Sequence, residues 1–139
     1  MKIVFVVFNL FLIVFIEAKI DFNIYEEDCI TQLNVDREQM IEAFNQDFYP
    51  EDNQDFTNVL TCSWKKAEII DKDENLDVDK LRQFLVDNFA KVQGSNYLIA
   101  TLVAADALHH CEHVKGQSRG DIAVKMSNCI LRKLDSYDV

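Results

Sequence analysis

The fold class of this chain is decided by the stretch LRQFLVDNFAKVQGSNYLIATLVAADALHHC, residues 81–111. Its first half repeats apolar residues at the three- and four-residue spacing of an amphipathic helix, which we expect Gly94 to end. The repeated positions are Leu81, Phe84, Leu85, Phe89 and Val92. Residues 95–111 are apolar on almost every side, which predicts a helix that its neighbours bury all round, at the centre of the fold.

The segments on either side of this stretch also have helical spacing. We expect helices over residues 22–33, from Asp36 to the apolar positions around Phe44, over residues 56–70, from about Asp77, and over residues 120–134. The whole chain of 139 residues has only one proline and three glycines, so few positions break a helix. The sequence therefore predicts an all-α fold of about six helices.

An apolar leader precedes the helical part. Lys2 supplies a positive start, residues 3–16 are apolar apart from Asn9, and Ala18 is a small residue at a cleavage position. A transmembrane helix is the alternative, but the run is shorter than the roughly 20 residues that a bilayer needs, and no basic cluster follows it. We therefore expect residues 1–18 to be a signal peptide, residues 19–139 to form one secreted domain, and no segment to insert into a membrane.

Four cysteines follow the leader, at positions 29, 62, 111 and 129. An even number behind a secretory signal predicts two disulfides, and four cysteines allow three pairings. No C-x-x-C motif is present, which disfavours zinc and redox sites. The formal net charge of -10 disfavours nucleic acids and anionic membranes as partners, since both are bound by clustered Lys and Arg.

The predicted domain is rich in phenylalanine, together with Trp64 and tyrosines, and ligand pockets are lined mainly by such side chains. The alternative is that these side chains only fill a core. For a pocket we predict lining residues from the two helices of residues 81–111, with the hydroxyls of two of them offered to the ligand. The predicted ligand-binding residues are Phe84, Phe89, Tyr97, Thr101, Leu102, Ala105 and Leu108, and the hydroxyls are those of Tyr97 and Thr101.

The cysteine framework resembles the insect odorant-binding proteins of the pheromone-binding type. Cys29, Cys62, Cys111 and Cys129 are spaced as the first, third, fourth and sixth cysteines of that family, and CSWKKAEIID, residues 62–71, is similar to its segment after the third cysteine. The similarity is to the four-cysteine subclass and covers essentially the whole predicted domain. The interval from Cys62 to Cys111 is several residues longer than is usual in that family.

The places of the two missing cysteines are held by Asn58 and Gly120, which would belong to one bridge. The resemblance implies six helices around an internal apolar cavity, and a secreted carrier that reversibly binds odorants, pheromones or similar small hydrophobic molecules. It implies a monomer or weak dimer, with a membrane receptor as a further partner. Related four-cysteine proteins of saliva or venom supply the alternative function, in which the chain sequesters small mediators or binds another protein. The implied disulfides are Cys29 with Cys62 and Cys111 with Cys129.

Metal and catalytic sites are not expected. Asp71 and Asp73 begin a sequence like a calcium loop, but Leu76 replaces the glycine of that motif. His109 and His113 have the spacing of metal ligands without an evident third ligand. No nucleophile, base and orienting group form a recognisable set, so we expect no cofactor, no metal and no enzyme activity.

Overall fold

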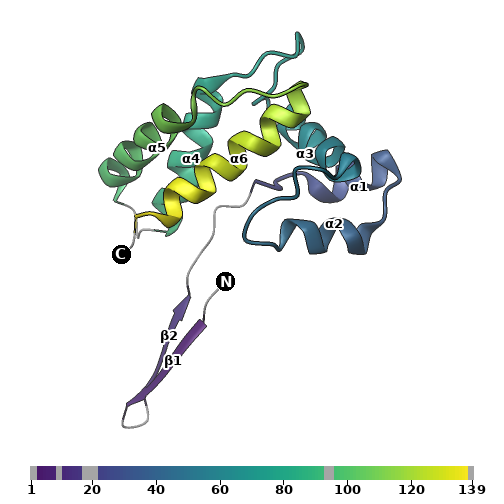
Figure 1. Cartoon of the computed structure of the whole chain (residues 1–139). Coiled ribbons are helices and arrows are strands. Elements are labelled where there is room, and N and C mark those ends of the chain that lie inside the picture. Colours follow the sequence, from purple (N-terminus) through teal and green to yellow (C-terminus); the bar gives the residue numbers. More distant parts are fainter. Residues whose placement is uncertain (1–2, 9–10, 17–21, 93–95, 138–139) are drawn as a thin grey trace.

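The computed structural model describes residues 3–8, 11–16, 22–92 and 96–137. The predicted cleavage after Ala18 and the predicted helix end at Gly94 lie outside these ranges. Six helices follow one another within residues 22–137, which confirms the all-α prediction (Figure 1). They are α1 (Glu26–Leu33), α2 (Arg37–Phe44), α3 (Gln54–Lys66), α4 (Val78–Val92), α5 (Tyr97–Cys111) and α6 (Arg119–Asp135).

The predicted leader contains two short strands. β1 (Ile3–Phe8) pairs with β2 (Phe11–Ile16) in antiparallel register, with Ile3 opposite Ile16 and Phe8 opposite Phe11. Figure 1 shows this hairpin extending away from the helices. The six helices therefore pack against one another without the hairpin of the leader.

Polar side chains set the beginnings of the helices. Asp36 caps α2 as predicted, because its Oδ1 accepts a hydrogen bond from the Gln39 backbone N–H at 3.0 Å. Asn53 caps α3 in the same way, and α3 therefore begins at Gln54, two residues before the predicted start. α1 begins at Glu26 rather than at residue 22, so that Phe22 belongs to the segment before the helix.

Two disulfides join neighbouring helices. Cys29 of α1 is bonded to Cys62 of α3, and Cys111 of α5 is bonded to Cys129 of α6. The Cα atoms are 5.9 Å and 5.8 Å apart, within the usual range for a disulfide. The implied pairing is confirmed.

The prediction that α5 is buried on all sides was wrong. A stripe of small residues, Ala100, Ala104 and Ala107, is fully buried, and α5 packs against α4 and α6. Leu98 and Leu102, on the other side of α5, are 69% and 62% exposed, and Tyr97, at the start of the helix, is 58% exposed. Close packing of helices favours the alanine stripe, so the larger apolar side chains are left on the outer face. The helix with the longest run of buried positions is instead α6.

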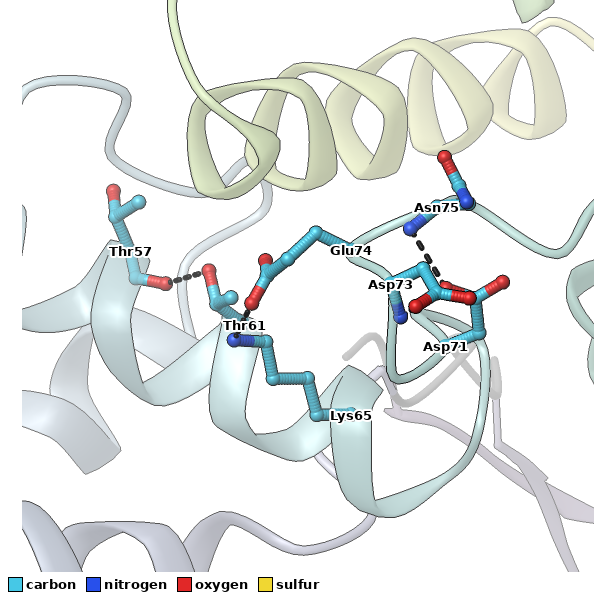
Figure 2. Close-up of polar contacts among 7 residues, drawn as sticks. All are labelled: Thr57, Thr61, Lys65, Asp71, Asp73, Glu74 and Asn75. Atoms are coloured by element: carbon cyan, nitrogen blue, oxygen red, sulfur yellow. Dashed lines mark hydrogen bonds and ion pairs between the residues drawn. The ribbon is translucent and has the colours of Figure 1, made fainter.

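Helices α3 and α6 approach closely at Gly120. A Cβ atom added to Gly120 would lie 2.6 Å from Thr61 Oγ1 and 2.7 Å from Thr57 Cγ2. Thr61 Oγ1 is held there by donating to the Thr57 carbonyl oxygen at 2.6 Å (Figure 2). Asn58 is exposed, and its side chain accepts a hydrogen bond from Gln54. At the place where the resemblance would put a third disulfide, α3 and α6 are therefore in direct contact.

Replacing Gly120 by alanine should lower the free energy of unfolding by about 2 kcal/mol, because the added methyl group overpacks the contact between α3 and α6. Urea unfolding of Gly120→Ala measures the loss. The additional changes Thr57→Ser and Thr61→Ala remove the two contacting atoms and should recover part of it. A Gly120→Ala protein as stable as the wild type, as helix propensity alone would favour, contradicts this packing.

Candidate functional site

Six aromatic rings form a continuous cluster between the helices, which we call the aromatic cluster. Phe22 is its centre, with ring centroids 6.3 Å from Tyr49, 6.2 Å from Trp64 and 5.7 Å from Phe84. Tyr49 continues it to Phe44 at 5.7 Å and to Phe56 at 5.1 Å. The members come from three helices and from two segments outside them: Phe44 (α2), Phe56 and Trp64 (α3), Phe84 (α4), Phe22 and Tyr49.

The seven predicted ligand-binding residues do not lie together. Phe84 belongs to the aromatic cluster and is half-buried, Phe89 is half-buried, and Leu108 is buried. Tyr97, Leu102 and Ala105 of α5 are exposed. The list of inward-lying residues is therefore short: Phe84, Phe89 and Leu108.

The two predicted hydroxyls are not turned to a common site. Thr101 donates its hydroxyl to the Tyr97 carbonyl oxygen at 2.8 Å, one turn back along α5. The Tyr97 side chain is mostly exposed. A ligand role for these residues stays a prediction.

Tyr49 was missed by sequence reasoning. It precedes Pro50, outside every predicted helix, yet it is buried, and Asn128 of α6 holds it there. Asn128 Oδ1 accepts from the Tyr49 backbone N–H at 2.7 Å, and Asn128 Nδ2 donates to the Tyr49 carbonyl oxygen at 2.8 Å. This pair joins residues far apart in sequence, so no local pattern could have indicated it.

Trp64 brings a polar group to the aromatic cluster. Its side chain is fully buried, and its indole Nε1 has no hydrogen-bond partner among the described residues. Among the described residues, Arg119 Nε is the other buried side-chain polar atom that has no hydrogen-bond partner. Buried polar groups in native proteins are nearly always paired, so an unpaired N–H beside an aromatic cluster is a candidate point of ligand recognition.

Two depressions lie on the surface, apart from the aromatic cluster. One of about 550 Å³ runs along α2 and is lined by Glu38, Ile41, Glu42, Asn45 and Gln46. The other, of about 490 Å³, lies between α1 and α3 and is lined by Gln32, Leu33, Asn58, Thr61, Cys62, Lys65 and Lys66. Both are open to solvent, and no residue of the aromatic cluster lines either of them.

The loop that resembles a calcium site uses its acidic groups internally. Asp71 Oδ1 accepts hydrogen bonds from the backbone N–H groups of Asp73 and Asn75, both at 2.9 Å. Glu74 forms an ion pair with Lys65 of α3 at 2.5 Å (Figure 2). These contacts fold the loop back against α3 and give it a structural role.

The histidines lie at the exposed end of α5. His109 Nδ1 and His113 Nε2 are 3.4 Å and 3.3 Å from the same carboxylate oxygen of Glu112. Across the part of the chain that the structure describes, no three His, Cys, Asp or Glu side chains are grouped so that they could hold a metal ion.

The start of α6 carries a carboxylate with a shifted pKa. Asp121 Oδ2 accepts from the Gln117 backbone N–H at 2.9 Å and from Lys125 Nζ at 3.0 Å. These bonds, with that of Gln117 the stronger influence, lower the pKa of Asp121 because they favour its ionised form.

The stabilisation by Asp121 is complete above the carboxyl's unfolded pKa of about 4 and is lost as the pH falls through the lower folded pKa. We therefore expect Asp121→Asn to lower the melting temperature most at neutral pH, with a difference from the wild type that shrinks below about pH 4. Thermal unfolding followed by circular dichroism across this range measures the difference. A constant difference at every pH would contradict it.

Comparison with known families supplies the identification. A sequence profile described as the PBP/GOBP family matches residues 16–133, which include both disulfides and most of the helical domain. The chain belongs to the PBP/GOBP family. This is the insect odorant-binding family, and it is a binding and carrier family. Comparisons with curated proteins and with solved structures gave no significant match.

Membership of the PBP/GOBP family makes this chain an odorant-binding carrier in general terms. The family implies that its ligands are small hydrophobic molecules. None of the helices in the described ranges is long and apolar enough to cross a membrane.

Proposed function

We propose that this protein is a secreted carrier that takes up a small hydrophobic odorant, pheromone or similar semiochemical into the aromatic cluster and releases it reversibly. The observation that carries the proposal is the aromatic cluster itself, in which rings from α2, α3 and α4 meet around Phe22. The apolar leader of residues 1–18 and the two disulfides support secretion into an oxidising compartment.

The mechanism is partition of the ligand between water and protein. Burial of apolar ligand surface contributes about 25 cal/mol per Å², offset by the loss of ligand freedom. Phe84 is half-buried while Phe22 and Trp64 are fully buried, so the aromatic cluster runs from the surface to the core at α4. We propose that the ligand enters beside Phe84, with Phe89 and Leu108 as further apolar neighbours, and that a membrane receptor is a later partner.

Uptake of an environment-sensitive apolar fluorophore by the disulfide-bonded protein tests this function. Volatile alcohols, esters, fatty acids and biogenic amines would then be offered as competitors. Saturable uptake and competitive displacement at micromolar concentrations are expected. No uptake by correctly folded protein would contradict a carrier function.

A second function is favoured by the outer face of α5. Leu98, Ile99 and Leu102 form an exposed apolar surface there, and exposed apolar surface often marks a contact with another molecule. We propose, as the alternative, a salivary or venom-type protein that binds another protein or sequesters small mediators. Leu98→Ser and Leu102→Ser should leave fluorophore uptake unchanged if the carrier function is the correct one.

A further inference from the structure

The indole of Trp64 is placed to recognise a polar atom. Trp64 is the single tryptophan of the chain and is fully buried. Its Nε1 has no partner among the described residues. An indole N–H can only donate, so what it lacks is an acceptor. Leaving a buried donor unpaired costs free energy that a bound acceptor would recover.

None of the buried polar side chains, Thr57, Ser63, Ser127 and Asn128, is bonded to the indole N–H. Ser127 donates its hydroxyl to the Ala123 carbonyl oxygen at 2.8 Å, and Asn128 is bonded to the backbone of Tyr49. Ser63 Oγ accepts from the Tyr25 backbone N–H at 3.3 Å. The Trp64 carbonyl oxygen accepts from the backbone N–H groups that follow α3. The described residues therefore leave the indole N–H without an acceptor.

The ring environment of Trp64 suits an apolar molecule. The Phe22 ring is tilted by 37° to the indole, and their ring centroids are 6.2 Å apart. The ring centroid of Phe84 is 5.7 Å from that of Phe22. Buried charge is absent from the described core, whose buried polar residues are Thr57, Ser63, Ser127 and Asn128. An ionised ligand group would be left without a countercharge there, which is costly.

We infer that the Trp64 indole N–H donates a hydrogen bond to a neutral oxygen acceptor on the ligand. This inference rests on the proposed carrier function. It makes the preferred cargo a hydrophobic ketone, aldehyde, ester, ether or alcohol. Hydrocarbons lack the acceptor, and protonated amines have no lone pair to offer. Trp64 thus determines specificity, while Phe22 and Phe84 supply apolar contact.

A matched pair of ligands tests this role. The wild type should bind a medium-chain methyl ketone about tenfold more tightly than the alkene of the same chain length, as one added hydrogen bond predicts. Trp64→Phe keeps an aromatic ring without the N–H, and should bind both equally. Phe84→Leu is the control: it should weaken both ligands and preserve their ratio. Dissociation constants come from displacement of the apolar fluorophore.

A second measurement needs no variant. Protein labelled with ¹⁵N has one indole N–H resonance, from Trp64. The ketone should move this proton resonance downfield and slow its exchange with water, and the alkene should not. A ketone that binds without this change, or a preference that survives in Trp64→Phe, overturns the inference and leaves the carrier function intact. Failure of every ligand to bind overturns both.

Discussion

Replacing Cys29 and Cys62 together by alanine should lower the free energy of unfolding by about 4 kcal/mol. The bridge closes a loop with a sequence separation of 33 residues, and its loss frees the unfolded chain to occupy many more conformations. α1 is only eight residues long, too short to be stable alone, so the bridge also keeps it against α3. Alanine is preferred to serine because Cys29 is fully buried.

The second bridge provides the control for this prediction. Cys111 and Cys129 close a loop with a separation of 18 residues, so their replacement should cost less, about 3 kcal/mol. Urea unfolding of both double variants at neutral pH measures the two losses of free energy. The dependence of the free energy of unfolding on urea concentration should be the same for both variants. A loss below about 1 kcal/mol for the Cys29 and Cys62 variant would show that packing alone holds α1 in place.

Replacing Asn128 by alanine should cost about 3 kcal/mol. The change removes both hydrogen bonds to the Tyr49 backbone, at 2.7 Å and 2.8 Å, within a buried part of the structure. It also frees a member of the aromatic cluster, so affinity for the apolar fluorophore should fall with stability. Urea unfolding and fluorophore titration measure these two effects.

An exposed asparagine supplies the comparison. Asn58 lies on the surface of α3, where its side chain accepts an exposed hydrogen bond from Gln54 Nε2 at 2.9 Å, so Asn58→Ala should change stability by less than about 0.5 kcal/mol. If Asn128→Ala and Asn58→Ala were equally stable, the anchoring of Tyr49 by α6 would be wrong.

Local sequence signals were sufficient to predict the helices. The spacing from Leu81 to Phe89 predicted α4, and Asp36 marked the start of α2, because both signals act within one or two turns. The pairing of the four cysteines came from the family resemblance, since spacing alone left three choices.

The site was less accessible to sequence reasoning, for two physical reasons. α5 is apolar on nearly all sides, so hydropathy could not tell that its alanine stripe faces the other helices while Leu98 and Leu102 face outward. Phe22 and Tyr49 lie outside helices, where no periodicity indicates burial, and their positions depend on contacts with α3, α4 and α6.

Contact quenching of Trp64 tests the central claim, ligand binding within the aromatic cluster, most directly. A long-chain ester carrying bromine on its alkyl chain quenches tryptophan fluorescence at close contact, and Trp64 is the single tryptophan of the chain. The account predicts saturable quenching at one ester per protein, reversed by the same ester without bromine. Binding of the ester without quenching, or no binding by protein with both disulfides formed, would contradict it.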